Sequence, residues 1–243
     1  METVSLKGKI VVVTGGGSGL GAAICRRLCD DGAEVIACDI QADAAEGVAE
    51  ELRAQGGRAH AFHLDVGDEK AVQETAQDLL DQFERVDVLI NNAAIDVTKP
   101  FKDISVEEWD RVLDVNLRGA FLLSRLVYPW MLHEGSGHIV NIVSTAAKRA
   151  WTEASAYHAS KWGLLGFSHA LHAEARRHGV KVTAVVSGGM RTPFILDRFP
   201  DIDQSTLQDP ANVAEVVRFA LALPAESVIP EVMVVPMKEA SWP

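Results

Sequence analysis

The stretch Thr14–Gly21, TGGGSGLG, places five glycines among eight residues at the end of the apolar run KIVVVTG (Lys9–Gly15). A helical pattern, Gly19–Asp31, begins inside it. Glycine suits neither a strand nor a helix interior, so the stretch predicts a loop between the two. Backbone N–H groups at a helix N-terminus favour an anion. Because the glycine spacing matches neither G-x-G-x-x-G nor a P-loop, this loop alone is either a phosphate cradle or a simple turn.

Strand-like and helical patterns alternate along the rest of the chain. The further strand candidates are Glu34–Ile40, Arg58–Val66, Val86–Ala94, His138–Ser144, Val180–Gly188 and Glu231–Pro236. The further helical patterns are Asp43–Gln55, Asp68–Phe83, the stretch from Ser105 to Leu132, Ser155–His178 and Pro210–Leu223. Most strand candidates are almost continuously apolar, as in strands buried on both faces. We therefore expect an α/β fold: a single Rossmann-like domain over residues 1–243, with a doubly wound parallel sheet of about seven strands flanked by helices.

Composition narrows the possible functions. The 243 residues carry a formal net charge of −11, which argues against nucleic-acid binding. No apolar run reaches the roughly 18 residues of a membrane span, and the N-terminus lacks a signal-peptide core. The three cysteines, Cys25, Cys29 and Cys38, are an odd, low count that fits a reducing compartment. We expect a cytoplasmic protein with no membrane or nucleic-acid partner and no metal site.

Polar residues follow several predicted strands. Asp39 ends the second strand, where a carboxylate can accept both ribose hydroxyls of an adenosine and would repel a 2′-phosphate. No Lys or Arg lies from Thr14 to Cys25, so we expect NAD rather than NADP as the cofactor. Asp65 and Val66 end the third strand and Asn91–Ala94 the fourth, and open α/β sheets bind ligands in the crevice where such ends meet.

Tyr157 and Lys161, in YHASK, are four residues apart and share one helix face. An ammonium about 5 Å from the phenol is expected to lower the tyrosine pKa by roughly two units, which makes Tyr157 an acid/base for an alcohol. Ser144 ends a strand entering the same crevice and is expected to orient the substrate oxygen. Asn116 interrupts a helical pattern with a side chain suited to holding a water that connects Lys161 to solvent protons.

Taken together, these elements resemble the short-chain dehydrogenase/reductase family from about Lys7 to Pro236. TGGGSGLG resembles its T-G-x-x-x-G-x-G loop, Asn91–Ala94 its N-N-A-G motif, and the four residues Asn116, Ser144, Tyr157 and Lys161 its catalytic tetrad. The resemblance implies a homotetramer or homodimer. The cofactor residues expected from the strand ends and from the resemblance are Gly15, Gly17, Ser18, Gly19, Leu20, Gly21, Asp39, Ile40, Asp65, Val66, Asn92, Ala93, Ala94, Tyr157, Lys161, Gly188 and Thr192.

The chain also departs from the family pattern. Ala94 replaces the last glycine of N-N-A-G, and Ser187 stands where P-G-x-x-x-T has proline. The C-terminus, EVMVVPMKEASWP, resembles the branch with a short tail.

The substrate is less defined by the sequence. The irregular segment 190–209 is expected to be a substrate loop. Candidate lining residues are Asp96, Ala146, Trp151, Met190 and Phe194. We expect an NAD(H)-dependent enzyme that interconverts a secondary alcohol and a ketone on a small or medium hydroxy compound, cyclic or sugar-like. The alternatives are a 3-oxoacyl-thioester reductase acting on acyl carrier protein or CoA, and a non-catalytic NAD-binding structural protein.

Overall fold

The central element of the fold is a seven-stranded sheet in which every neighbouring pair of strands is parallel. The structure, a computed structural model, describes residues 4–239, so the ends of the predicted domain, 1–3 and 240–243, lie outside it. The strand order is β3-β2-β1-β4-β5-β6-β7, which confirms the predicted doubly wound fold. The strands are β1 (Ile10–Thr14), β2 (Glu34–Asp39), β3 (Arg58–His63), β4 (Val88–Asn91), β5 (Gly137–Ser144), β6 (Val180–Ser187) and β7 (Glu231–Val234).

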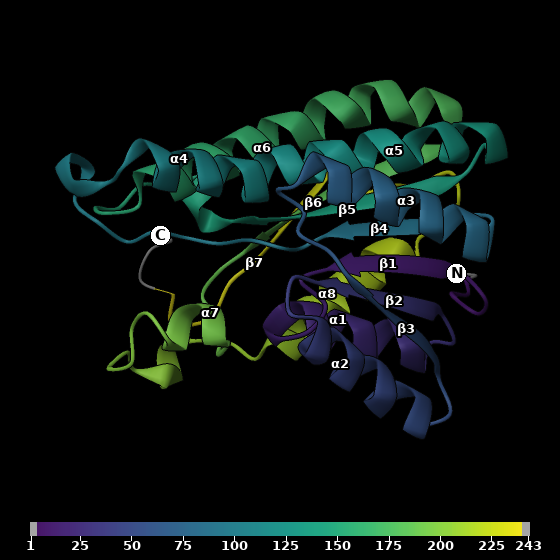
Figure 1. The fold of residues 1–243 in the computed structure, drawn as a ribbon, viewed down its shortest axis with the longest axis horizontal. Coiled ribbons are helices and arrows are strands. Elements are labelled where there is room, and N and C mark those ends of the chain that lie inside the picture. Colours follow the sequence, from purple (N-terminus) through teal and green to yellow (C-terminus); the bar gives the residue numbers. More distant parts are fainter. Residues whose placement is uncertain (1–3, 240–243) are drawn as a thin grey trace.

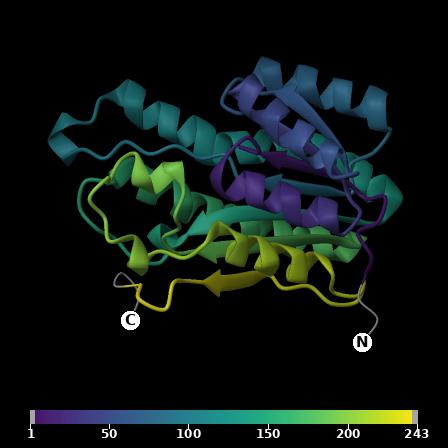
Figure 2. The same ribbon diagram turned by 90° about the horizontal axis from the view of Figure 1, so that it is seen from below.

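Helices cover both faces of this sheet (Figure 1). One face carries α1 (Gly19–Asp30), α2 (Ala42–Ala54) and α8 (Pro210–Leu221), and Figure 2 looks onto the side where α1 and α8 lie. The opposite face carries α3 (Glu69–Phe83), α4 (Val106–Leu113), α5 (Gly119–Glu134) and α6 (Ser155–Ala175). The short α7 (Pro193–Leu196) lies beyond the carboxyl ends of the strands. Because both faces are covered, all five residues of β1 are buried, which explains its continuous apolar run.

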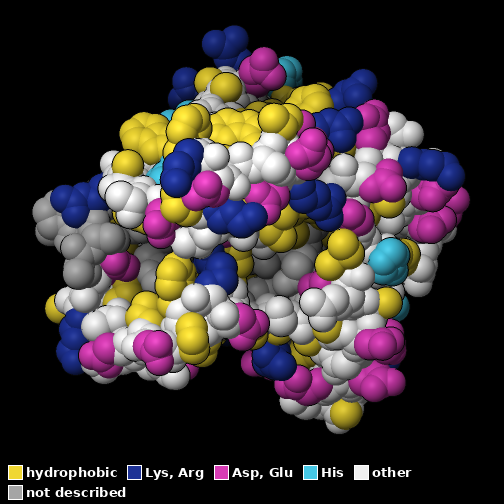
Figure 3. All heavy atoms as spheres, turned by 60° about the vertical axis from the view of Figure 1, so that its left-hand side comes forward, with side chains coloured by type: hydrophobic (Ala, Val, Ile, Leu, Met, Phe, Trp, Pro, Cys, Tyr) yellow, Lys and Arg dark blue, Asp and Glu magenta, His cyan; other side chains and the backbone are white. Residues whose placement is uncertain are grey.

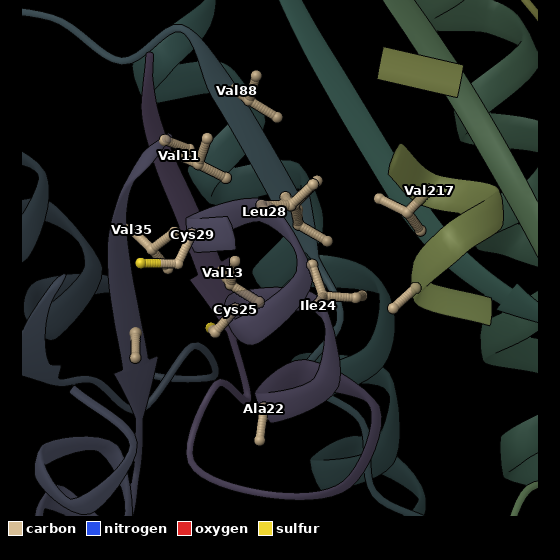
Figure 4. Packing of buried hydrophobic residues seen from close by; sticks show 14 of the residues in the cluster. Val11, Val13, Ala22, Ile24, Cys25, Leu28, Cys29, Val35, Val88 and Val217 are labelled. Atoms are coloured by element: carbon tan, nitrogen blue, oxygen red, sulfur yellow. The ribbon is translucent and has the colours of Figure 1, made fainter. Parts of the chain in front are cut away.

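The packing of α1 fixes the glycine loop against the sheet. Ile24 and Leu28 of α1 are fully buried among Val11 and Val13 of β1 and Val217 of α8 (Figure 4). Burying a side chain of this size stabilises the fold by about 1.5–3 kcal/mol. The N-terminus of α1 is therefore held rigidly at the carboxyl end of β1.

Two predicted strands end three residues earlier than the sequence suggested. The third was expected to reach Val66, but β3 ends at His63, because Asp65 turns the chain by accepting a hydrogen bond from the Gly67 amide at 2.9 Å. The fourth was expected to reach Ala94, but β4 ends at Asn91. The next backbone amides donate to the Thr14 hydroxyl rather than continuing the ladder.

The helical stretch predicted from Ser105 to Leu132 is divided in the structure. Its start is confirmed, because Ser105 and Glu108 form a capping box at the start of α4. Residues Asp114–Arg118 then form a π-helical turn between α4 and α5. Such turns are frequent at functional sites, and Asn116 lies within this one. Within residues 4–239, no helix is both long and apolar enough to cross a membrane.

Candidate active site

The carboxyl ends of the strands and the segment around α7 enclose a cavity of about 850 Å³. Figure 3 brings this edge of the molecule forward, and the surface there is hollowed. The predicted residues that line the cavity are Gly15, Ser18, Gly19, Leu20, Asp39, Ile40, Asp65, Val66, Asn92, Ala93, Ala94, Asp96, Ser144, Trp151, Tyr157, Lys161, Gly188, Met190, Thr192 and Phe194. The predicted residues that do not line it are Gly17, Gly21, Asn116 and Ala146.

The glycine loop is tied to the end of β4 by Thr14 and Asn92. The Thr14 hydroxyl accepts hydrogen bonds from the amides of Asn92 and Ala93, both at 3.0 Å. The Asn92 side chain donates to the carbonyls of Thr14 and Gly15 at 2.9 and 3.2 Å. Gly15 has a φ of 63°, in the left-handed region, and a Cβ there would meet the Ala93 backbone at 3.0 Å. Two strand-end loops therefore form one rigid wall of the cavity.

Gly17 and Gly21 shape this loop but are not among the residues that line the cavity, and their contact with a cofactor stays a prediction. A Cβ on Gly17 would meet that of Ala44 at 2.8 Å. One on Gly21 would meet the Gly15 carbonyl oxygen at 1.9 Å. Both glycines are thus required by close packing of the loop against itself and against α2.

The N-terminus of α1 opens on the cavity without a side-chain cap. Ser18 makes no capping hydrogen bond there, and the first turn of α1 contains no acidic residue. By contrast, Asp68 caps α3 and Asp209 caps α8. Backbone N–H groups left uncapped at a helix N-terminus favour an anion, so this end of the cavity suits a phosphate.

The carboxylate of Asp39 lies at the same end of the cavity. It accepts hydrogen bonds from the Gly17 amide at 2.9 Å and from the Gln41 amide at 3.0 Å, so its position is fixed. Ile40 beside it is half exposed and provides an apolar surface. Asp65 is paired with Arg111, whose Nη2 lies 2.8 Å from Oδ2. The charge of that arginine is therefore already balanced by a carboxylate.

Ser144, Tyr157 and Lys161 meet in the middle of the cavity. The Lys161 Nζ lies 5.7 Å from the centroid of the Tyr157 ring and donates to the Ile142 carbonyl at 2.9 Å. The Ser144 hydroxyl hydrogen-bonds the phenol of Tyr157 and also accepts from the Ala146 amide at 3.1 Å. The structure therefore brings three of the four predicted catalytic residues together.

The ionisation of this cluster differs from the sequence-based expectation. Burial raises the pKa of Tyr157 to about 12, and the hydrogen bond from Ser144 opposes that rise. Burial lowers the pKa of Lys161 to about 8. The expected lowering of the tyrosine pKa by Lys161 does not appear here: removal of Tyr157 from water has the largest effect on its pKa, and the charges that act on it are those of Asp96 and Arg198. Tyr157 is accordingly a neutral phenol at neutral pH.

Asn116, the fourth predicted catalytic residue, is buried behind the cavity wall. Its amide donates to the Ile95 carbonyl and accepts from the Ile95 amide, both at 2.8 Å. The second N–H donates to the Ser160 hydroxyl at 3.0 Å. Both side-chain N–H groups are thus used by the protein, and these contacts fix the segment that follows β4. A relay water held at Asn116 stays a prediction.

Aromatic and charged side chains form the other end of the cavity. Phe194 packs against Tyr157 with the two rings tilted and their centroids 5.8 Å apart. The Arg198 guanidinium lies 4.1 Å from the Phe194 ring and is paired with Asp96. Trp151 also lines this end. Ala146, expected to line it, is instead completely buried behind the wall, where its carbonyl bonds His158 at 2.8 Å.

Several residues that shape the site are absent from the sequence-based predictions. Arg198 lies in the predicted substrate loop, but nothing in the local pattern pairs it with Asp96, 102 positions away. His158 is adjacent to Tyr157 and accepts from the Trp151 amide at 3.1 Å, which holds that loop. Thr14 begins the glycine loop, and the sequence does not indicate that its hydroxyl holds the end of β4. In the part of the chain that the structure describes, no group of three or more His, Cys, Asp or Glu side chains is placed to hold a metal ion.

Comparison with known proteins agrees with this geometry. The family model described as short chain dehydrogenase matches residues 9–202. A D-threitol dehydrogenase of Mycolicibacterium smegmatis is 39% identical over 180 residues, which are 74% of this chain and 69% of the relative. A cyclopentanol dehydrogenase of Comamonas sp. is 37% identical over 186 residues, 76% of this chain and 74% of the relative.

A solved structure also shows this fold. A metagenomic short-chain oxidoreductase in complex with NADP superposes with a TM-score of 0.86 at 34% identity, covering 96% of this chain and 99% of that one. The fold, the strand-end cavity and the Ser144–Tyr157–Lys161 cluster define a dinucleotide-dependent oxidoreductase. The chain belongs to the short-chain dehydrogenase family.

Proposed function

We propose that this protein is an NAD(H)-dependent dehydrogenase that interconverts a secondary alcohol and a ketone on a small or medium hydroxy compound. The observation that carries the proposal is the meeting of Ser144, Tyr157 and Lys161 in a cavity that continues to the uncapped N-terminus of α1. Relatives described as D-threitol and cyclopentanol dehydrogenases support a hydroxy compound as substrate.

The residues present fit a nicotinamide dinucleotide. The uncapped start of α1 suits its phosphates, and the fixed Asp39 carboxylate suits the hydroxyls of the adenosine ribose. We assign the nicotinamide end to Gly188 and Thr192, with Lys161 on the nicotinamide ribose. Ser187, in place of the family proline, donates to the Val143 carbonyl at 3.1 Å and so holds the end of β6 against β5. A bound nicotinamide supplies the acceptor or the donor of the hydride.

The protein residues then provide the proton and the orientation. In ketone reduction, the neutral Tyr157 phenol donates its proton to the substrate oxygen while Ser144 donates a hydrogen bond to the same oxygen. In alcohol oxidation the phenolate accepts the hydroxyl proton as the carbinol carbon loses a hydride. The Lys161 ammonium stabilises that phenolate electrostatically. Asn116 keeps the wall around this centre in place through Ile95.

The pKa shifts predict opposite pH dependences for the two directions. Alcohol oxidation needs Tyr157 as the phenolate, and a pKa raised to about 12 makes that form scarce at neutral pH. Between pH 6 and pH 9 we therefore expect kcat for oxidation to rise by at most about tenfold per unit up to about pH 8, and to level off above it, because Lys161 then loses the proton with which it stabilises the phenolate. Ketone reduction needs the neutral phenol and is expected to stay level or fall over the same range. Initial rates in both directions across this range test the assignment, and an oxidation rate that falls with rising pH would contradict it.

The preference for NAD rests on Asp39 and is tested by exchanging its charge. In the double variant Asp39→Ala/Ile40→Arg, loss of the carboxylate and gain of a cation favour a 2′-phosphate. We expect the ratio of kcat/KM for NADP to that for NAD to rise roughly tenfold to hundredfold, about 1.4–2.8 kcal/mol. Asp43→Ala, which removes an exposed carboxylate near the start of α2, is the matched control and is expected to leave the ratio unchanged. A wild-type enzyme that prefers NADP would overturn the Asp39 assignment.

Two alternative functions predict different results in enzyme assays. A 3-oxoacyl-thioester reductase would accept acetoacetyl thioesters with NADPH better than it accepts any free ketone. A non-catalytic dinucleotide-binding protein would bind NADH but turn over no alcohol or ketone. The placement of Ser144 against the Tyr157 phenol favours catalysis over the latter reading.

We also propose assembly into a homotetramer or homodimer through the helices of one face. Phe121 of α5 and Trp162 of α6 are about half exposed, which leaves large apolar side chains in water. Light scattering is expected to give the molar mass of a dimer or tetramer. In Trp162→Asp this molar mass is expected to fall.

A further inference from the structure

Asp96 is a buried acid at the substrate end of the cavity, beside the catalytic cluster. It follows the Ile95 segment that Asn116 clamps, and its side chain is only 6% exposed. It lines the cavity together with Ser144 and Tyr157. Its charge acts on both Tyr157 and Lys161, which places the carboxylate within electrostatic reach of the reacting centre.

The two carboxylate oxygens of Asp96 differ in their partners. Oδ2 accepts from Nη1 of Arg198. That guanidinium is held in turn by the Phe194 carbonyl, at 2.7 Å from Nε, and by the face of the Phe194 ring. Oδ1 is buried and has no hydrogen-bond partner among residues 4–239. An unmatched buried acceptor destabilises a fold, and buried polar atoms nearly always have partners.

A substrate hydroxyl is the group that matches this oxygen. Oδ1 needs a hydrogen-bond donor, which excludes a ketone, an ether or an alkyl group at that point. An ionised substrate carboxylate has no proton to donate to Oδ1, and Arg198 is already engaged. A substrate ammonium would find no net negative charge, because the Asp96–Arg198 pair is neutral overall. A neutral hydroxyl satisfies the oxygen without adding charge.

We propose that Asp96 determines substrate specificity by accepting a hydrogen bond, through Oδ1, from a second hydroxyl of the substrate. This inference rests on the proposed function and narrows it: the substrate is a neutral diol or polyol. One hydroxyl meets Ser144 and Tyr157, and another meets Asp96. Phe194 packs beside the carbon skeleton between these two points.

The test compares substrates that differ only in the second hydroxyl. The wild-type enzyme is assayed with NAD and cyclopentanol, 1,2- and 1,3-cyclopentanediol, and 2-fluorocyclopentanol, whose fluorine is close in size to a hydroxyl but cannot donate. Because a site built to bind a hydroxyl discriminates strongly against analogues lacking it, we expect kcat/KM for at least one diol to exceed those of cyclopentanol and the fluoro compound by about tenfold or more.

Variants then assign the preference to Asp96. Asp96→Asn keeps the size of the side chain but loses its charge. We expect kcat/KM to fall by about tenfold or more with the diol and by less than about threefold with cyclopentanol. Arg198→Lys retains a cation and is expected to keep the preference for the diol. Asp197→Asn, an exposed acid one position from Arg198, is the charge-matched control and is expected to change neither rate. NADH binding and thermal melting show that each variant is folded.

The outcomes separate this inference from the proposed function. Equal kcat/KM for diol, monool and fluoro compound, or an equal loss on all of them in Asp96→Asn, would overturn the role of Asp96 while leaving the dehydrogenase intact. Better turnover of an amino alcohol than of any diol would overturn the choice of a neutral hydroxyl. If no alcohol in the set reduces NAD, the proposed function fails and this inference fails with it.

Discussion

Tyr157→Phe is expected to lower kcat by roughly 10²–10⁴-fold in both directions, because a general acid/base contributes a factor of that size. The change removes only the phenolic oxygen. The aromatic ring that packs against Phe194 stays, so the fold and the cavity are expected to persist. Binding of NADH, measured by its fluorescence, is expected to change less than about threefold. Loss of rate with retained binding would assign proton transfer to Tyr157.

The matched control is the other tyrosine of the chain. Tyr128 lies in α5 and is not among the residues that line the cavity, so Tyr128→Phe is expected to leave kcat unchanged. Near-normal turnover in Tyr157→Phe would remove the central assignment. A parallel loss of NADH binding would show that the residue supports the cofactor site rather than the chemistry.

Gly21→Ala is expected to disrupt the glycine loop. Its Cβ would lie 1.9 Å from the Gly15 carbonyl oxygen and 2.7 Å from the Asn92 Nδ2, and the first of these is backbone that cannot swing aside. Overpacking of this kind costs about 1–3 kcal/mol, and at roughly 2–4 °C per kcal/mol the Tm is expected to fall by roughly 2–12 °C. Because the loop must move at the start of α1, NADH affinity is expected to fall by about tenfold or more.

Gly47→Ala provides the comparison within a helix. Nothing lies within 4 Å of a Cβ at Gly47, which is exposed on α2. The free energy of unfolding of that variant is expected to be unchanged or higher by about 0.5–1 kcal/mol, because alanine loses less backbone entropy on folding than glycine does. Calorimetry on both variants checks the pair, and equal Tm values for Gly21→Ala and the wild type would show that the loop is not packed as described.

The parts of this protein that depend on local patterns were predictable. Apolar runs such as β1 are buried on both faces, and the order of strands and helices fixes a doubly wound sheet. The positions of Asp39 and Tyr157 were also predictable from local sequence. One lies at a strand end, and the other is four residues from Lys161 on a single helix. In each case a short stretch of sequence determines where the side chain points.

The features that were missed arise from contacts between distant segments. The sequence leaves Asp96 open between a surface and a site position, because its partner Arg198 comes from the turn that follows α7. The sign of the Tyr157 pKa shift depends on burial, which pairwise spacing along a helix does not report. The hydrogen bonds of Asn116 to Ile95, 21 positions away, start from a π-helical turn that the helical pattern does not indicate. Sequence periodicity carries no signal for any of these three.

Transfer of deuterium tests the central claim most directly. The wild-type protein is incubated with NAD and a secondary alcohol or diol that carries deuterium on the carbinol carbon, and the reduced cofactor is analysed by mass spectrometry. We expect one deuterium in each molecule of NADH formed, together with one equivalent of ketone, and no such product from Tyr157→Phe on the same timescale. NADH without deuterium, or no NADH from any alcohol or diol, would contradict the assignment of this site as an alcohol dehydrogenase.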